Sequence, residues 1–294
     1  MNRSILTRTR RMLVTTASVS GMVSIPTSLI GISAFYFYHS ILVCLHLALS
    51  MVYLVVKSYY AVKNSALAFV YHHHRTPQLI AQDIKGLTKL PRHVAVILTY
   101  RANEEGGGVQ GLMEQVADVV SWSLGAGVSE LTVYERTGKL DALHERTYNV
   151  TTRTLESYYG TTVPVVKLRT PHDKTVYPAE SGLEPDLVVN FISKRDGREF
   201  MVELTRDLAV AAAKGELDPA KITVDLVDKL TSEMVISEPD LVVLFGPKLD
   251  LDGFPPWQVR LSEIYHAQAN KEVTYNVFLR GLRRYSYCKI NIGK

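Results

Sequence analysis

The most suggestive spacing in the chain is a run of glycines: residues 106–111 read Gly-Gly-Gly-Val-Gln-Gly and satisfy the pattern G-x-G-x-x-G. This pattern binds the diphosphate of a dinucleotide when it joins a strand to a helix, and Glu135 follows where a ribose-binding acid would lie. However, residues 99–105 separate the glycines from the preceding apolar run, and Glu104 and Glu105 would repel a diphosphate. We therefore expect a flexible loop here and keep a dinucleotide-dependent oxidoreductase as a third hypothesis.

The C-terminal end is the second stretch that could bind a ligand. From Val273 onward the chain has no acidic residue, and it carries five basic ones: Arg280, Arg283, Arg284, Lys289 and Lys294. It ends in Asn291-Ile292-Gly293-Lys294. Backbone N–H groups at a glycine-containing end, supported by basic charge, can bind an anion such as a diphosphate. An ordinary solvated basic tail explains this composition equally well.

The rest of the sequence offers little catalytic equipment. It contains no G-x-S-x-G, H-E-x-x-H, C-x-x-C or P-loop motif. The three adjacent histidines at 72–74 cannot share one helix face, so we expect a solvated patch there and not a metal site. Two cysteines, Cys44 and Cys288, imply no disulfide framework. The net charge of +4 is modest, and we expect no nucleic-acid partner.

The glycine run lies inside a predicted strand–helix–strand unit. The apolar run His93–Leu98 predicts a strand buried on both faces, residues 109–124 an amphipathic helix, and residues 130–135 a second strand. A crossover helix makes two such strands parallel. Ligands of parallel sheets bind beyond the carboxyl ends of the strands, so residues 99–108 should line any site.

The alternation continues along the chain. We expect further strands at 163–168, 186–192 and 240–245, the last strand, and further helices at 140–159, 203–214 and 219–233. Asp196-Gly197 predicts a hairpin turn that leads into residues 199–202. These elements predict an α/β fold with a mostly parallel sheet and helices on both faces.

The N-terminal part predicts a membrane segment at residues 12–56, because it has no charged residue. Residues 33–56 are long enough to span a bilayer, at about 36 Å of helix, and residues 13–32 are a weaker second candidate. A basic tail precedes them at 1–11, a juxtamembrane connector follows at 57–88, and the globular domain occupies 89–294. One span or two stays open, and so does the topology. The sequon at Asn149 would carry sugar only in a lumenal domain.

Several stretches of the domain resemble the cis-prenyltransferases. Residues 91–98, Pro-Arg-His-Val-Ala-Val-Ile-Leu, and 125–134, Gly-Ala-Gly-Val-Ser-Glu-Leu-Thr-Val-Tyr, are similar to their first two strands. Residues 239–243, 254–258 and 263–265 are similar to their last motif region. The resemblance covers the chain from about Lys89 to the end. It implies the fold of enzymes that elongate an allylic diphosphate with isopentenyl diphosphate.

Four positions depart from the catalytic pattern of that family. Thr99 stands in place of an aspartate that binds metal and diphosphate, Leu244 and Asp250 in place of arginines, and Lys248 in place of a glutamate. Two diphosphates and a divalent cation need those charges. We therefore expect no catalytic residue and no metal site in this chain, and no synthase activity from it alone.

The departures, the membrane segment and two short stretches (residues 196–198 and 205–206) resemble the accessory subunits of eukaryotic dehydrodolichyl diphosphate synthase, the Nogo-B receptor family. This resemblance implies a non-catalytic subunit anchored in the endoplasmic reticulum membrane, with its large domain on the cytosolic side. Its catalytic partner would condense isopentenyl diphosphate onto farnesyl diphosphate, giving long polyprenyl diphosphate for dolichol synthesis and protein glycosylation. Mg²⁺ would be held mainly by that partner.

The same resemblance implies a function for the tail at 286–294. In that family a C-terminal Arg-x-Gly reaches the partner's active site and helps to bind isopentenyl diphosphate. The matching residues here are Asn291, Ile292 and Gly293, followed by Lys294, so an amide replaces the guanidinium. The lost charge bears on the strength of the contact. The alternative hypothesis is a membrane receptor or tether that uses a dead enzyme fold as a binding module.

Overall fold

The computed structural model describes residues 29–71, 76–102, 104, 106–160, 162–172, 174–178, 184–268, 270 and 272–288. The tail residues Asn291 to Lys294, the histidines at 72–74 and most of the second span candidate lie outside these residues. The chain divides into two units, residues 1–56 and 57–294, and each is described by itself.

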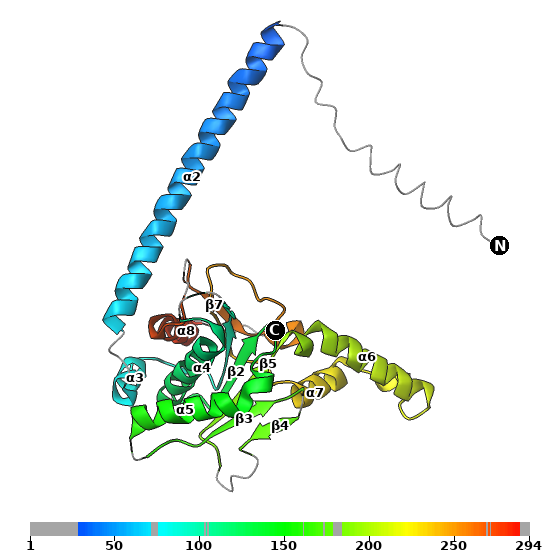
Figure 1. Cartoon of the computed structure of the whole chain (residues 1–294). Coiled ribbons are helices and arrows are strands. Elements are labelled where there is room, and N and C mark those ends of the chain that lie inside the picture. The colour runs from blue at the N-terminus through cyan, green and yellow to red at the C-terminus, as the bar shows by residue number, and fades with distance from the viewer. Residues whose placement is uncertain are drawn as a thin grey trace, which may run out of the picture. The chain divides into compact units, whose positions relative to one another are not determined.

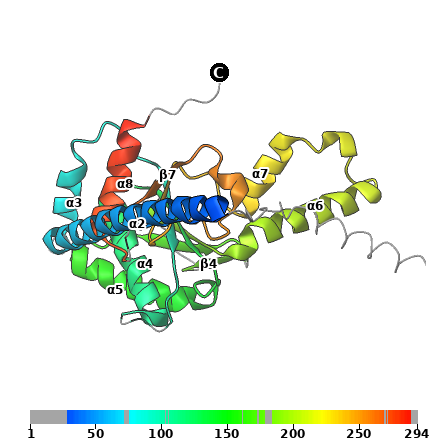
Figure 2. The same ribbon diagram turned by 90° about the horizontal axis from the view of Figure 1, so that it is seen from above.

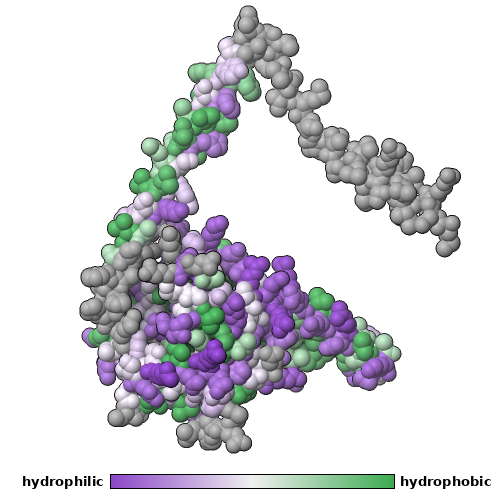
Figure 3. Space-filling view, in the orientation of Figure 1, coloured by the Kyte–Doolittle hydropathy of each residue, from purple (hydrophilic) through white to green (hydrophobic). Residues whose placement is uncertain are grey.

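The N-terminal unit contains most of one long helix, α2 (Leu29–Tyr71). Its stretch Ser33–Lys63 is long and apolar enough to cross a membrane by length and composition. Large apolar side chains such as Phe37 and Met51 are exposed along it, and hydrophobic surface follows its described part (Figure 3). At 43 residues the helix is about 65 Å long, twice what a bilayer core needs. It therefore extends beyond the predicted span on both sides.

The second unit is built on one seven-stranded sheet in the order β4-β3-β5-β2-β1-β6-β7 (Figure 1). All neighbours are parallel except β3 and β4. The strands are β1 (His93–Leu98), β2 (Glu130–Glu135), β3 (Val166–Thr170), β4 (Thr175–Tyr177), β5 (Leu187–Ile192), β6 (Leu241–Leu244) and β7 (Glu263–His266). The predicted mostly parallel α/β sheet is confirmed.

Helices cover both faces of this sheet. One group is α3 (Pro77–Ile84), α4 (Gly108–Gly125), α5 (His144–Tyr159) and α8 (Tyr275–Tyr287); the other is α6 (Arg198–Ala213) and α7 (Val224–Met234). Figure 2 shows the two groups on opposite sides, with α6 and α7 reaching away from the sheet. Short 3₁₀ turns at 141–143, 194–196, 219–221 and 256–259 complete the described elements.

Strand β1 explains why its sequence is apolar throughout. Val94, Val96 and Leu98 belong to the larger core under α4, α5 and α8, whereas Ala95 and Ile97 belong to the smaller core under α6 and α7. All six residues of β1 are buried. A central strand covered on both faces has no polar side to alternate with.

Part of the expected connector lies within the globular unit. Ile80 of α3 is fully buried, and its side chain lies against Gly125, where a Cβ would come within 3.0 Å of it. Asp83 accepts a hydrogen bond from the Tyr275 hydroxyl at 3.1 Å. The segment that follows α2 in the sequence is thus fixed to both α4 and α8.

The predicted hairpin at Asp196-Gly197 is wrong, because residues 199–202 belong to α6. Ser193 and Asp196 form a capping box around a 3₁₀ turn, and α6 follows directly. Gly197 has φ −87°, outside the positive region that a tight hairpin turn uses. Its glycine is required for another reason: a Cβ would lie 2.7 Å from the Gly253 carbonyl oxygen.

The sheet also continues past the strand that we predicted to be the last. β7 pairs in parallel with β6, from Leu241 opposite Glu263 to Leu244 opposite His266. The antiparallel edge strand β4 was not predicted either. The third strand begins at Val166 and not at Val163, since Pro164 has no N–H to donate to a neighbour.

Candidate functional site

Two cavities open at the carboxyl ends of the parallel strands, and Thr99, the residue after β1, lines both. The glycine-loop cavity, about 350 Å³, lies between residues 99–108 and the start of α4 and is also lined by Gln115 and Glu272. The strand-end cavity, about 220 Å³, lies beyond β1 and β6. Both cavities therefore lie at the edge of the sheet where the sequence predicts that any site would be.

The four departures from the catalytic pattern meet in the strand-end cavity. Thr99, Leu244, Lys248 and Asp250 all line it. They come together because β1 and β6 are adjacent parallel strands, with Ile97 opposite Leu244. The functional meaning of these residues stays a prediction, but they share a single cavity.

The charges of the strand-end cavity do not suit a diphosphate. Among the described residues that line it, Lys248 is the only basic one, and Asp250 and Asp252 are acidic. Asp252 accepts a hydrogen bond from Arg136 at 2.7 Å, and its backbone N–H donates to Asp250 at 2.8 Å. These carboxylates hold the loop after β6 in place. A diphosphate entering here would meet two negative charges and one positive charge.

Tyr134 also contacts this loop, and its hydroxyl is already engaged in a hydrogen bond. Tyr134 donates a hydrogen bond from its hydroxyl to the backbone oxygen of Asp252 at 2.6 Å. Burial, with a smaller contribution from the charge of Asp252, raises the pKa of Tyr134 well above its usual range. The phenol is therefore a structural donor and not an acid–base group at neutral pH.

The expectation that this chain has no metal site of its own stays a prediction. Within the described ranges, no group of three or more histidine, cysteine or acidic side chains is placed to hold a metal. Thr99 offers a neutral hydroxyl at the end of β1, where a divalent cation favours a carboxylate. We derive no chemical step through a metal in this chain.

The glycine loop is closed by its own backbone hydrogen bonds. The N–H of Gly107 donates to the Glu104 oxygen at 2.9 Å, and the N–H of Gly108 donates to the Arg101 oxygen at 2.7 Å. The Arg101 guanidinium is paired with the Glu104 carboxylate at 2.8 Å. A phosphate cradle needs free N–H groups. The N–H groups of Gly107 and Gly108 already donate within the loop itself.

Glu135, the candidate ribose-binding acid, is also engaged. The residue is 1% exposed, and its carboxylate accepts hydrogen bonds from the N–H groups of Thr137 at 2.8 Å and Lys139 at 3.1 Å. It therefore fixes the turn after β2 and does not point at a ligand. Together with the closed glycine loop, this gives the dinucleotide hypothesis no geometric support.

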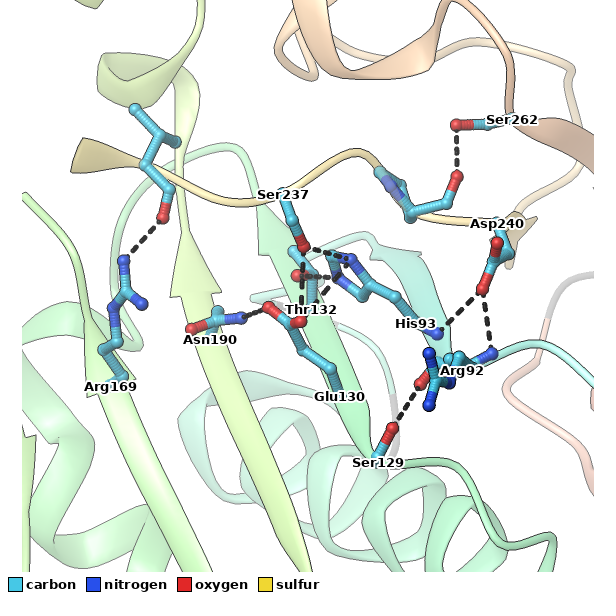
Figure 4. Close-up of polar contacts among 12 residues, drawn as sticks. Arg92, His93, Ser129, Glu130, Thr132, Arg169, Asn190, Ser237, Asp240 and Ser262 are labelled. Carbon is cyan, nitrogen blue, oxygen red and sulfur yellow. Dashed lines mark hydrogen bonds and ion pairs between the residues drawn. The ribbon is translucent and has the colours of Figure 1, made fainter. Parts of the chain in front are cut away.

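A polar cluster at the opposite end of the strands was not anticipated (Figure 4). His93 and Glu130, the first residues of β1 and β2, lie side by side in register. His93 Nε2 lies 2.8 Å from the Thr132 hydroxyl, and its Nδ1 lies 3.0 Å from the Ser237 hydroxyl. Asn190 donates to Glu130 at 2.8 Å. The sequence did offer one signal for this cluster: each of these two buried strands begins with a polar residue.

This cluster contains a serine, a histidine and a glutamate, but it is not a hydrolytic triad. In a triad the histidine bridges the serine and the acid. Here Ser237 is the bridge, since its hydroxyl donates to Glu130 at 3.2 Å and lies 3.0 Å from His93 Nδ1. Burial lowers the pKa of His93, against the smaller opposing effects of Glu130 and Asp240. The arrangement satisfies a neutral imidazole and leaves no activated nucleophile.

The C-terminal helix carries the chain away from the two cavities. α8 follows β7 and returns toward the beginning of that strand, because Cys288 just after α8 contacts Glu263, the first residue of β7 (Sγ–Oε2, 3.2 Å). The described chain thus ends at the amino ends of the strands. Cys288, the last described residue, therefore lies at the far end of the sheet from the two cavities.

The arm formed by α6 and α7 exposes apolar side chains to solvent. These are Val202 (58% exposed), Val210 (47%), Val224 (64%) and Met234 (42%). The opposite side of α6 packs Phe200 and Leu204 into the smaller core. Exposed hydrophobic residues on a protruding arm make it a candidate surface for a protein–protein contact.

Comparison with known proteins shows the family. No protein-family model matches the chain. The chain is 36% identical over 284 residues to the dehydrodolichyl diphosphate synthase complex subunit NUS1 of Saccharomyces cerevisiae, covering 90% of this chain and 76% of the relative. It is 37% identical over 230 residues to the nus1 subunit of Schizosaccharomyces pombe, covering 77% and 86%. The chain belongs to the NUS1 family. The predicted resemblance is confirmed.

The NUS1 family is itself related to prenyl diphosphate synthases. The chain is 23% identical over 270 residues to the tritrans,polycis-undecaprenyl-diphosphate synthase (geranylgeranyl-diphosphate specific) of Methanocaldococcus jannaschii, covering 82% of this chain and 94% of the relative. The chain thus combines the fold of these enzymes with a strand-end cavity whose charges differ from those predicted for catalytic members.

Proposed function

We propose that this NUS1-family chain is the non-catalytic, membrane-anchored subunit of a heteromeric cis-prenyltransferase. The observation that carries the proposal is the strand-end cavity, where Thr99, Leu244, Lys248 and Asp250 meet in a chain whose relatives are named as subunits of a synthase complex. The catalytic partner condenses isopentenyl diphosphate onto farnesyl diphosphate. Its product is a long polyprenyl diphosphate for dolichol synthesis and protein glycosylation. Mg²⁺ is held mainly by the partner.

The tail completes the partner's active site. Asn291, Ile292, Gly293 and Lys294 bind the diphosphate of the substrate there through backbone N–H groups, an amide and one ammonium group. The course of α8 supports action on another chain, because Cys288 lies at the amino ends of the strands, whereas both cavities open at the carboxyl ends. The six residues that follow span at most about 20 Å when extended.

The partner docks on the exposed face of the α6–α7 arm. Burying Val202, Val210 and Val224 together would remove several apolar side chains from water, at about 25 cal/mol per Å² of apolar surface. The long helix α2 anchors the complex in the endoplasmic reticulum membrane, with the large domain on the cytosolic side. The membrane candidate Ser33–Lys63 supports the anchor by its length and composition.

The test compares this chain alone, a catalytic cis-prenyltransferase alone and the co-purified complex, each with isopentenyl diphosphate, farnesyl diphosphate and Mg²⁺. We expect no product from this chain alone and more product from the complex than from the partner alone. Removing Gly293 and Lys294 should reduce the activity of the complex at least about 10-fold, the cost of roughly one charge-assisted contact, while the heterodimer stays intact on gel filtration.

Three outcomes would contradict the proposal. Synthase activity of the isolated chain would show that its own cavity is functional. Undiminished activity after removal of the last two residues would exclude the tail's role. If co-expression with the catalytic chain left its activity unchanged, the alternative of a membrane receptor or tether would account for the fold instead.

A further inference from the structure

The Glu263 carboxylate holds the end of the C-terminal helix at two points. Its Oε1 accepts a hydrogen bond from Arg284 Nε at 3.2 Å, and its Oε2 accepts one from Cys288 Sγ at 3.2 Å. Arg284 lies in the last turn of α8, and Cys288 is the first residue after it. The carboxylate raises the pKa of the Cys288 thiol, chiefly through this hydrogen bond, so the thiol remains a donor at neutral pH.

The opposite side of the helix end is held as well. The Thr88 hydroxyl donates to the backbone oxygen of Ser286 at 2.7 Å. Lys89 Nζ lies 4.3 Å from the centre of the Tyr285 ring, within the range of a cation–π contact. Residues 88–89 and Glu263 thus enclose the last turn of α8, a place where helices commonly fray.

Glu263 is itself part of the rigid sheet. It opens β7, it pairs with Leu241 of β6, and its backbone N–H donates to the Asp240 oxygen at 3.0 Å. Asp240 in turn accepts the N–H groups of Arg92 and His93. The helix end is therefore tied to the start of three adjacent strands and not to a loop.

We propose that Glu263 is a positioning residue for the shared diphosphate site, because it fixes the end of α8, after which the C-terminal tail begins. This inference rests on the proposed function of the tail in the partner's site. A tail of six residues that starts from a fixed point searches a small volume, so its effective concentration at the partner's site is high. A tail that starts from a frayed helix end searches a larger volume.

The experiment uses the co-purified complex with a catalytic cis-prenyltransferase and measures kcat and KM for isopentenyl diphosphate. Glu263→Ala should raise this KM about 3- to 10-fold, as expected for the loss of two modest hydrogen bonds, and change kcat less than about 2-fold. Cys288→Ser keeps a donor and should retain the normal KM, whereas Cys288→Ala should raise it. Glu156→Ala removes an exposed glutamate on α5 and is the matched control, with no change expected.

A double-mutant cycle separates positioning from general structure. In a complex that lacks Gly293 and Lys294, Glu263→Ala should have no further effect, because there is no functional tail left to direct. An equal loss in the full-length and the truncated chain would assign Glu263 a structural role and overturn the inference. If Glu263→Ala prevents folding, the Cys288→Ser and Cys288→Ala pair makes the same test.

The two proposals fail in different ways. If removal of the tail lowers activity but neither Glu263→Ala nor Cys288→Ala changes the KM, the positioning role of Glu263 is refuted and the proposed function stands. If removal of the tail itself has no effect, the proposed function of the tail is refuted, and the positioning role of Glu263 is refuted with it.

Discussion

Gly111 has no room for any side chain, because a Cβ would lie 1.9 Å from the Gly106 carbonyl oxygen. We expect Gly111→Ala to displace the glycine loop and to lower the free energy of unfolding by about 1–3 kcal/mol, the usual cost of overpacking. The urea midpoint, followed by fluorescence of the buried Trp122, measures this in detergent. Gly86→Ala is the control, since it meets nothing within 4 Å. Equal midpoints for both variants would contradict the requirement for glycine at 111.

His93 should make the stability of the domain depend on pH. Its pKa is lowered by burial, so between the folded pKa and the ordinary value near 6.5 the unfolded chain binds more protons. Stability is therefore full above pH 6.5 and falls as the pH decreases toward the folded pKa, by up to about 1.4 kcal/mol per pH unit. Urea midpoints between pH 7.5 and 5 measure this fall.

Replacing the imidazole separates its contribution from that of the other titrating groups. His93→Gln should be less stable at pH 7.5 but should show a flatter pH dependence below 6.5. His144→Gln, at the other end of the sheet, should keep the slope of the natural protein. An unchanged slope in His93→Gln would show that His93 does not dominate this range.

In the proposed complex, the α6–α7 arm is the element on which partner binding depends. Val224→Asp places a charge on a side chain that is 64% exposed, so the isolated chain should unfold as before, within about 0.5 kcal/mol. The heterodimer with the catalytic chain should weaken at least about 10-fold, because burying an unpaired carboxylate is costly. Co-purification and a dissociation constant by light scattering measure this. Glu216→Asp, at the exposed turn beyond α6, is the charge-conserving control; full binding by Val224→Asp would exclude this face.

The central elements could be predicted from sequence, and the edges could not. β1 and β2 begin and end where the apolar runs predicted, because strands buried on both faces need continuous hydrophobic residues. β7 has the mixed sequence Glu-Ile-Tyr-His, and its pairing with β6 determines its conformation. The turn at 193–197 depends on a capping box, which is only distinguished from a hairpin turn by backbone geometry.

For the candidate site, the family resemblance pointed to the positions that depart from the catalytic pattern. It identified Thr99, Leu244, Lys248 and Asp250, and the parallel register of β1 and β6 explains why they share a cavity. The polar cluster at His93 and the contacts of Glu263 with the end of α8 were not predicted. Both join residues more than 20 positions apart, so neither leaves a local pattern in the sequence.

At the scale of the whole molecule, two sequons report the topology. Asn2-Arg-Ser4 precedes the predicted span and Asn149-Val-Thr151 follows it; Asn149 is exposed on α5. With a single crossing and a cytosolic domain, sugar should be absent from Asn149 and can form only at Asn2. Endoglycosidase digestion of the natural chain, Asn2→Gln and Asn149→Gln measures this. A mobility shift that disappears in Asn149→Gln would place the domain in the lumen.

The direction of α8 also limits how such chains can be combined. Under the proposed function, two copies of this polypeptide would bring together two tails and two poorly charged cavities, so self-association should yield no working centre. In the proposed complex, a mixed pair supplies one suitable cavity and one tail that completes it. The amount of polyprenyl diphosphate produced should therefore be limited by the scarcer of the two subunits. Overproduction of this subunit beyond its partner's level should not increase that amount.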